Sequence, residues 1–381
     1  MKKQYNILAV SMLSVLLSFE ATAFETAAKN AILVDYETGA YIYAKNHDKQ
    51  MAPASMSKLM TLYIVFDKIK NGTLSLDDTF TVSENAWRKG GAASGSSTMF
   101  LKIGEKVKVE DLLKGIIIQS GNDACITVAE NIAGSEEDFA LLMNETAEKI
   151  GLENSTFANS TGWPHPDHKM SVEDLAKLSK LLIKDFGEYY HLFSQKEFTH
   201  NGIKQGNRNP LLYSMDSADG LKTGHTDEAG FCLTASAQKN GRRLISVMGG
   251  MKSNKERSEE AEKLMNYGFR EFDNYTILKK GDVLATANVW YGKSQTLDLT
   301  VSKDIVQTVK RNMRNKYQIK VSYEDPIKAP IKKGDKVGTV SFVHPDGNKA
   351  DYPLVAANDV EQISVFKKFI ANLKYLILGN K

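Results

Sequence analysis

The chain has 381 residues, enough for two domains and a sizeable hydrophobic core. Its apolar fraction of 42% and charged fraction of 25% are typical of a soluble globular protein. The net charge of +3 is close to neutral, and we find no basic stripe interleaved with aromatic residues, so nothing indicates a nucleic-acid-binding protein.

The N-terminus has the pattern of a secretory signal peptide. Lys2 and Lys3 precede an apolar run over residues 7–17, and Ala21-Thr22-Ala23 supplies a small-residue cleavage site. The run is too short for a membrane span, so we predict cleavage after Ala23. Export argues against cofactors confined to the cytoplasm, such as ATP and nicotinamides, and the sequence contains no glycine-rich phosphate loop.

Two short strands are predicted at residues 31–35 and 40–44, joined by turn residues into an antiparallel hairpin. A helix entered at Pro53 follows. Its expected buried stripe consists of Leu59, Tyr63, Phe66 and Ile69, with Met60 and Ile64 beside it.

Ser55 and Lys58 lie three residues apart at the start of that helix and therefore share one face. A serine hydroxyl is a poor nucleophile unless an adjacent base takes its proton. Lys58 is a candidate base if burial or a nearby cation keeps its amine neutral. Alone, the pair also fits a helix cap followed by a solvated lysine.

Residues 90–97 are predicted to form a flexible loop, which on an enzyme can gate a site but is more often a connection. Buried helices are predicted over 109–118 and 123–132. Ser120-Gly121-Asn122 falls between them, where a hydroxyl and an amide can project into a cleft. The alternative is ordinary turn and capping chemistry.

Residues 154–169 are predicted to be irregular. His165 and His168 flank Asp167, but no helical histidine pair supports a zinc site, so we predict no metal. Ser171 and Asp174 indicate a helix start of the capping-box type. The buried face of this helix is expected to contain Leu175, Leu178, Leu181 and Leu182. Whether Cys125 and Cys232 form a disulfide remains open.

Lys222 and Thr223 are predicted to lie on or just before an antiparallel strand, and Asn240-Gly241 indicates a hairpin leading to a strand over 244–248. A helix is expected over 256–269. From 274 to 358, short β-like runs broken by turns predict a small all-β domain. It has no catalytic cluster, which favours a spacer or a partner-binding module.

The last segment, 359–381, is predicted to be an amphipathic helix lying in a membrane interface. The alternative is a helix packed on the protein. Its apolar face contains Ile363, Phe366, Phe369, Ile370, Leu373, Leu376 and Ile377, opposite Lys367, Lys368, Lys374 and the terminal Lys381.

Three motifs occur in order: Ser55-x-x-Lys58, Ser120-Gly121-Asn122 and Lys222-Thr223-Gly224. This combination resembles the penicillin-recognising serine hydrolases. The stretches 53–61, 119–125 and 222–226 are similar to those of the low-molecular-mass penicillin-binding proteins that act as D-alanyl-D-alanine carboxypeptidases in Gram-negative bacteria. The similarity covers nearly all of the mature chain, although residues 163–169 look less typical.

The resemblance implies an α/β (α+β) fold, with an antiparallel sheet covered by helices, a small all-β C-terminal domain and an amphipathic tail helix. The expected divisions are a signal peptide (1–23), a carboxypeptidase domain (24–273), a β-rich domain (274–358) and a membrane-anchor helix (359–381). The expected location is the periplasm, on the outer face of the inner membrane. Expected partners are peptidoglycan stem peptides and β-lactam antibiotics, with no cofactor and no nucleic acid.

The resemblance also implies the site residues. Ser55 attacks the bond between the last two D-alanines, Lys58 acts as base, and the N–H groups of Ser55 and His225 form an oxyanion hole. The implied catalytic residues are Ser55, Lys58, Ser120, Asn122 and Lys222, and the implied substrate-binding residues are Thr223, Gly224, His225 and Arg208. Ser120 relays a proton to the leaving amine, and Thr223 and Arg208 hold the terminal carboxylate.

Three alternatives remain. A β-lactamase shares the motifs, but residues 154–169 lack the Glu-x-x-x-Asn arrangement that positions a deacylating water. A D,D-endopeptidase shares every motif. A non-catalytic wall-binding scaffold is opposed by the intact Ser55, Lys58, Ser120 and Lys222.

Overall fold

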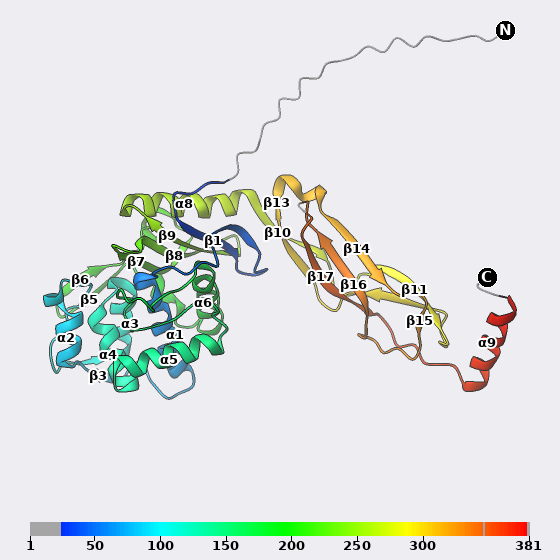
Figure 1. Cartoon of the computed structure of the whole chain (residues 1–381), viewed down its shortest axis with the longest axis horizontal. Helices are drawn as coiled ribbons and strands as arrows, with labels where there is room; N and C mark the ends of the chain where they lie inside the picture. The colour runs from blue at the N-terminus through cyan, green and yellow to red at the C-terminus, as the bar shows by residue number, and fades with distance from the viewer. Residues whose placement is uncertain (1–23, 346, 379–381) are drawn as a thin grey trace, which may run out of the picture.

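The computed structural model describes residues 24–345 and 347–378, which form two bodies and a terminal helix in an elongated molecule (Figure 1). The predicted signal peptide, 1–23, lies outside the described residues. The helix α8 (Asn254–Glu271) leads directly into the first strand of the second body, β10 (Phe272–Leu278). A single chain crossing therefore joins the two bodies.

The first body is built on a five-stranded antiparallel sheet in the order β2-β1-β9-β8-β7. The pairing of β1 with β2 confirms the predicted hairpin, and Asn240 and Gly241, both with positive φ, form the turn between β8 and β9. The strands are β1 (Asn30–Asp35), β2 (Tyr41–Lys45), β7 (Ala218–Thr226), β8 (Gly230–Lys239) and β9 (Arg242–Met251).

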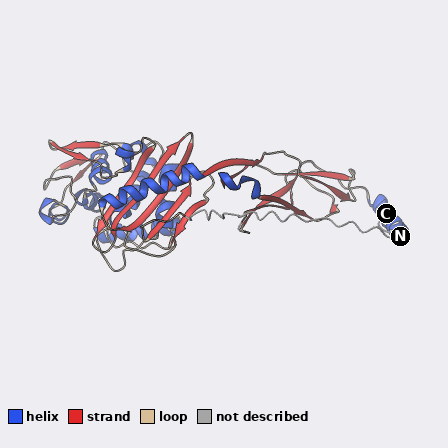
Figure 2. Cartoon of the chain, turned by 90° about the horizontal axis from the view of Figure 1, so that it is seen from above, coloured by secondary structure: helices blue, strands red, loops and turns tan. Residues whose placement is uncertain are grey.

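Helices cover both faces of this sheet, as alternating side chains require. Ile32 and Val34 of β1 pack against the helices on one face, whereas Ala31 and Leu33 pack against α8 on the other. Figure 2 shows α8 lying across the strands. The remaining α-helices of this body are α1 (Lys58–Lys70), α2 (Glu84–Gly90), α3 (Val109–Lys114), α4 (Asn122–Ala133), α5 (Glu136–Lys149), α6 (Val172–Asp185) and α7 (Leu211–Ser214).

Short elements connect these helices and strands. They include the predicted loop at 90–97, which contains one 3₁₀ turn. The short helices are η1 (Ala54–Ser57), η2 (Ala92–Ser94), the π-helix η3 (Gly115–Gln119) and η4 (Tyr190–Ser194), and the small hairpins pair β3 (Thr79–Thr81) with β4 (Lys106–Lys108) and β5 (Glu197–His200) with β6 (Ile203–Gly206).

The helix α1 is more deeply buried than its sequence pattern predicted. Instead of one apolar stripe, every residue from Lys58 to Phe66 is buried, because α4, α5 and α6 pack around it. This position places the polar start of α1, including the Lys58 amine, inside the protein.

The second body is the predicted all-β unit. It contains a six-stranded sheet in the order β14-β16-β17-β12-β11-β15 and a separate pair of β10 with β13. Its core includes Leu297, Leu299, Val340 and Leu354. Besides β10, the elements are β11 (Ala285–Trp290), β12 (Thr296–Thr300), β13 (Ile305–Lys310), η5 (Arg311–Lys316), β14 (Gln318–Tyr323), β15 (Ile327–Lys328), β16 (Lys336–Val343) and β17 (Lys349–Ala356).

A buried ion pair fixes the junction between the bodies. Arg242 Nε lies 2.8 Å from the buried carboxylate of Asp35, and another Arg242 nitrogen donates to the Phe272 carbonyl at 2.7 Å. Asn274 of β10 donates to Asp35 at 3.0 Å. The base of the second body is therefore hydrogen-bonded to the first sheet.

The terminal helix α9 (Val365–Leu378) lies at the far end of the second body (Figure 1). Its side chains Val365, Phe366, Phe369 and Leu376 are between 65% and 82% exposed. It joins the second body mainly at Tyr291, whose carbonyl accepts from Ile363 and whose ring lies under Lys368. None of the helices in the described ranges reaches the length and hydropathy that a bilayer span requires.

Candidate active site

A cleft of about 580 Å³ lies along the free edge of β7 and contains most of the predicted site residues. We call it the Ser55 cleft. Its lining includes the predicted Ser55, Ser120, Arg208, Thr223, Gly224 and His225 and the unpredicted Ser97, Asn207, Tyr213, Phe231 and Arg257. Lys58, Asn122 and Lys222 are buried beneath these residues. All nine predicted residues therefore gather in one region.

Ser55 lies in η1, immediately before α1 begins. The preceding Ala54 has a φ of 48°, a left-handed conformation that costs energy for a residue with a Cβ. The Ser55 hydroxyl accepts a hydrogen bond from Lys58 Nζ at 2.9 Å. The predicted contact between these two side chains is thus present.

The Lys58 amine has two further partners. It donates to Asn122 Oδ1 at 2.7 Å and to the Thr161 carbonyl at 2.5 Å. The pKa of Lys58 is lowered to about 8, mainly by burial and also by the positive charge of Arg208, while Cys125 and nearby acids oppose the shift. Near neutral pH an appreciable fraction of this amine is therefore uncharged.

A neutral lysine amine has two protons and one lone pair. Asn122 Oδ1 and the Thr161 carbonyl can only accept hydrogen bonds, so they take both protons. The lone pair is then left facing the Ser55 hydroxyl. This geometry allows Lys58 to remove the Ser55 proton as the hydroxyl attacks.

Ser120 and Asn122 lie where η3 meets α4. Ser120 has a φ of 64°, and its buried Oγ is without a hydrogen-bond partner in the described part of the chain. Because a buried hydroxyl without a partner is costly, this atom is suited to bond something that enters the cleft. The adjacent Asn122 N–H donates to the Ser97 carbonyl at 2.7 Å, which fixes the turn.

Lys222 to His225 lie on β7, as predicted. Lys222 is buried, and its amine donates a hydrogen bond to the Thr223 carbonyl at 3.3 Å. Burial lowers the pKa of Lys222 well below its usual value, with contributions from the charges of Lys58 and Arg208. A Cβ at Gly224 would lie only 3.0 Å from the Pro53 carbonyl. Glycine at this position therefore lets β7 approach the start of η1, the short helix that contains Ser55; we call this segment the Ser55 turn.

Two arginines line the same cleft. Arg208 donates to Ser97 Oγ at 2.5 Å. Arg257 was not predicted, because an arginine at the start of the polar helix α8 carries no distinguishing signal. It donates to Asn254 at 2.5 Å, its buried Nε is unpaired within the described residues, and burial lowers its pKa to about 10.

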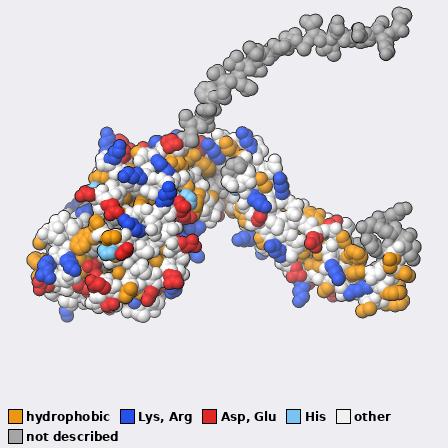
Figure 3. Space-filling view, in the orientation of Figure 1, with side chains coloured by type: hydrophobic (Ala, Val, Ile, Leu, Met, Phe, Trp, Pro, Cys, Tyr) orange, Lys and Arg blue, Asp and Glu red, His pale blue; other side chains and the backbone are white. Residues whose placement is uncertain are grey.

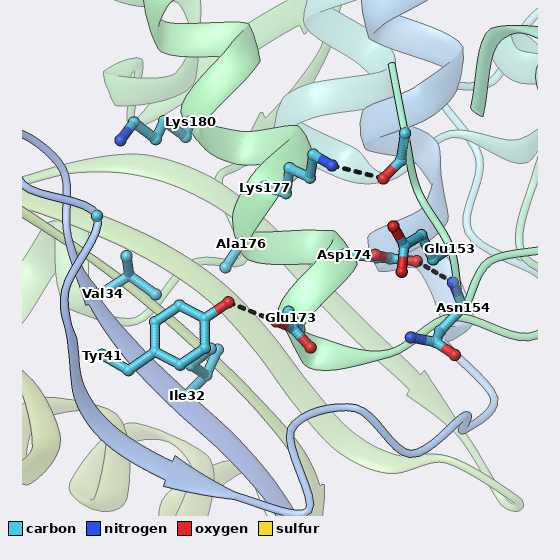
Figure 4. A pocket seen from close by; sticks show the side chains of 12 residues that line it. Ile32, Val34, Tyr41, Glu153, Asn154, Glu173, Asp174, Ala176, Lys177 and Lys180 are labelled. Atoms are coloured by element: carbon cyan, nitrogen blue, oxygen red, sulfur yellow. Dashed lines mark hydrogen bonds between the residues drawn. The ribbon is translucent and has the colours of Figure 1, made fainter. Parts of the chain in front are cut away.

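The irregular segment 154–169 supplies the Thr161 carbonyl, which sequence reasoning also missed. Asn159 holds this segment by accepting from the N–H groups of Gly162 and Trp163. At its start, Asp174 of α6 accepts from the Asn154 N–H at 2.7 Å (Figure 4). The predicted capping box is therefore only half present: Ser171 caps the helix, but the Asp174 carboxylate bonds Asn154 and Ser155 instead.

His168 of this segment does not face a metal site. It is buried, accepts from the Ala158 N–H at 3.2 Å, and burial lowers its pKa to about 4. No group of three metal-ligating side chains occurs in the ranges that the structure describes. Cys125 and Cys232 are both buried free thiols, which answers the open question of their pairing.

A second hollow, of about 370 Å³, lies between α6 and the hairpin β1–β2 (Figure 4). We call it the α6 cavity. Tyr41 donates to Glu173, and Lys177 donates to the Gly151 carbonyl at 2.5 Å. Its lining combines the carboxylates of Glu153, Glu173 and Asp174 with the ammonium groups of Lys177 and Lys180, and neither lysine is buried.

The Ser55 cleft has the features of a serine hydrolase that uses a lysine base. Comparison with family models agrees: residues 18–253 match the family described as D-alanyl-D-alanine carboxypeptidase, and residues 272–362 match the C-terminal domain of penicillin-binding protein 5. The chain belongs to the D-alanyl-D-alanine carboxypeptidase family. It is therefore a hydrolase of the serine D-Ala-D-Ala carboxypeptidase type, with the predicted fold confirmed.

Individual relatives match over most of their length. The chain is 42% identical to D-alanyl-D-alanine carboxypeptidase DacC of Escherichia coli K12, over 89% of this chain and 86% of that protein. The structure of penicillin binding protein 5 from Haemophilus influenzae matches with a TM-score of 0.79 at 36% identity, covering 90% of this chain and 99% of that one. Penicillin binding protein 6B from Escherichia coli matches with a TM-score of 0.72 at 37% identity, covering 89% and 98%.

Proposed function

We propose that this enzyme removes the terminal D-alanine from peptidoglycan stem pentapeptides through an acyl-enzyme on Ser55. The observation that supports this most strongly is the Lys58 amine, whose two acceptors leave its lone pair directed at the Ser55 hydroxyl 2.9 Å away. General-base catalysis of this kind contributes about 10²–10⁴-fold to a rate.

The reaction proceeds in two stages. Ser55 Oγ bonds to the carbonyl carbon of the penultimate D-alanine while Lys58 takes its proton, and the oxyanion is held by the N–H groups of Ser55 and His225. The C–N bond then breaks, and the Ser120 hydroxyl relays to the leaving amine the proton that Lys58 took from Ser55. Water next hydrolyses the ester, which releases the shortened peptide and frees Ser55. β-Lactams acylate Ser55 in the same way.

The cations of the cleft have separate roles in this proposal. Arg208 and Thr223 bind the terminal carboxylate, since a guanidinium can grip it with two hydrogen bonds. Lys222, buried on β7 beneath the cleft, keeps the region around Ser120 electropositive. Asn122 bonds Lys58 through its oxygen and leaves its amide hydrogens for the substrate carbonyl. Gly224 lets β7 lie against residues 53–56, which keeps the substrate-binding edge of β7 beside Ser55.

Release of D-alanine from a soluble pentapeptide tests this function, with Ser55→Ala as the inactive reference. The wild-type protein should release D-alanine and the variant should not. A cross-linked peptide dimer is the second substrate. If only the dimer is cleaved, the enzyme is a D,D-endopeptidase, and if neither is cleaved while penicillin is destroyed, it is a β-lactamase.

We also propose that residues 24–273 form the catalytic domain and residues 274–358 a separate β domain. Residues 1–23 then act as a signal peptide and 359–381 as an anchor on the outer face of the inner membrane, which makes the protein periplasmic. The exposed apolar side chains of α9 support the anchor. Deleting residues 363–381 should release the protein from sedimenting membranes, and a truncated protein that still sediments would contradict the anchor.

A further inference from the structure

Although the net charge of the chain is close to neutral, a basic segment lies at the end of the second body that adjoins the first body. Residues 310–320 contain five basic and no acidic residues. Four are exposed and one is half-buried; they are Lys310, Arg311, Arg314, Lys316 and Lys320. Within the described part of the chain only Arg311 forms an ion pair, with Asp273 at 3.0 Å. This surface therefore carries positive charge that the protein does not neutralise.

A groove of about 250 Å³ lies between this segment and the edge strand β2. We call it the junction groove. Its lining includes Tyr41, Phe272, Lys310, Met313, Tyr317 and His344. Tyr41 is 50% exposed, and the Tyr317 ring is held by stacking on Phe342 at 5.0 Å. The groove thus offers aromatic faces beside the ammonium group of Lys310, and the rest of the basic segment continues from it along the chain.

Aromatic faces beside cations suit a ligand that has both flat apolar surfaces and negative charge. A peptidoglycan strand has this chemistry, because its sugar rings present C–H faces and its stem peptides end in carboxylates. Lipid headgroups share only the negative charge. The groove is therefore better matched to the glycopeptide than to a lipid surface.

The position of the groove also separates it from the proposed membrane anchor. His344 lines the groove just before β17, and α9 follows the opposite end of that strand. Eight residues of β17 span about 27 Å. Figures 1 and 2 show η5 beside the first body and α9 at the far end of the second. The surface charge of a membrane bound by α9 is screened within about 8–10 Å. It therefore does not act on the groove.

We propose that the junction groove and its basic segment bind a peptidoglycan strand and hold it beside the catalytic body. This inference rests on the proposed action on peptidoglycan. The groove adjoins β2 and the Ser55 cleft adjoins β7, and these two strands are the opposite edges of one sheet. Four strand spacings separate the two edges, which is about 19 Å. A strand bound at the groove raises the local concentration of stem peptides at the cleft.

Binding to insoluble peptidoglycan sacculi tests the groove without depending on catalysis. The test variant combines Lys310→Gln, Lys316→Gln and Lys320→Gln, and a second variant carries Tyr317→Ala. The matched control removes three exposed lysines of the same body far from the groove: Lys332→Gln, Lys333→Gln and Lys336→Gln. The groove variants should sediment with sacculi about tenfold more weakly, as loss of three exposed ionic contacts implies.

Activity distinguishes this inference from the proposed function. The groove variants should release D-alanine from sacculi several-fold more slowly and from a soluble pentapeptide at the wild-type rate. Unchanged binding to sacculi would overturn the inference, as would an equal loss in the control variant. Loss of binding to anionic phospholipid vesicles with unchanged binding to sacculi would identify a membrane site instead. Failure of the wild-type protein to hydrolyse the soluble peptide would refute only the proposed function.

Discussion

The Ser55 cleft and the α6 cavity differ in how their charges are compensated. The cleft brings together Lys58, Lys222, Arg208 and Arg257, and no acidic side chain of the described residues lines it. The α6 cavity instead contains both carboxylates and lysines, and its Glu173 and Lys177 are hydrogen-bonded to the Tyr41 hydroxyl and to a backbone carbonyl (Figure 4).

This difference separates a working site from a structural hollow. Uncompensated cations and the unpaired Ser120 hydroxyl are costly in the folded protein, so their presence in the cleft indicates that a substrate compensates them. In the α6 cavity, carboxylates and lysines line the same hollow, and neither lysine is buried. Substitutions in the cleft should therefore change catalysis, whereas those in the cavity should change only stability.

The largest effect is expected for Lys58→Arg. A guanidinium cannot give up its proton in a protein, so it cannot act as the base. We expect acylation by benzylpenicillin, followed by stopped-flow fluorescence, to slow by about 10³-fold. Lys177→Arg in the α6 cavity is the matched control and should acylate normally. Normal acylation of Lys58→Arg would contradict the role of the amine.

Gly162→Ala should have the next largest effect. Gly162 has a φ of +80°, and an added Cβ would lie 2.1 Å from the Ala54 carbonyl. Relief of this clash displaces either the Ser55 turn or the Thr161 carbonyl, and a displacement of about 1 Å can cost 10²-fold in rate. Gly202→Ala has a similar φ of +75° but open space, so it should lose stability alone. Equal rate losses in both variants would show that the clash is irrelevant.

The acylation rate should depend on pH through Lys58. Because the base must be neutral and its pKa is about 8, the rate should fall about tenfold per pH unit below that value and level off above it. Arg208→Gln removes a positive charge that lowers this pKa, so the midpoint should move to higher pH, whereas Arg208→Lys should leave it in place. If the pH midpoint of acylation is the same in the wild-type protein and both variants, the charge of Arg208 does not lower the pKa of Lys58.

The smallest effect is expected for Tyr41→Phe, which deletes the hydrogen bond to Glu173 in the α6 cavity but keeps the ring. At a half-exposed position the loss should be about 0.5 kcal/mol of unfolding free energy, measured by urea denaturation. Acylation should be unchanged. A clear loss of acylation would mean that the α6 cavity communicates with the Ser55 cleft.

The sequence predicted the parts of the site that side chains provide. Ser55 and Lys58 are linked by helical spacing, and Ser120 and Lys222 were found by motif and order. The Thr161 carbonyl was missed because every residue has a carbonyl and the fold alone brings this one, 103 positions away, to Lys58. Arg257 was missed because its burial depends on how α8 packs against β8.

Local sequence patterns likewise predicted the helices and strands, but not the tertiary contacts that surround them. The stripe on α1 was identified, whereas its burial on all sides depends on helices later in the chain. The capping residue Ser171 was correct, but the partner of Asp174 lies across a tertiary contact to Asn154. Contacts between distant segments have no signature in a single sequence.

The most direct test of the central claim is the intact mass of the protein after incubation with benzylpenicillin, recorded beside Ser55→Ala. We expect one penicilloyl adduct on the wild-type protein, located by peptide mapping at Ser55, and none on the variant. An adduct that persists on Ser55→Ala, or no adduct on the wild-type protein, would contradict Ser55 as the nucleophile activated by Lys58.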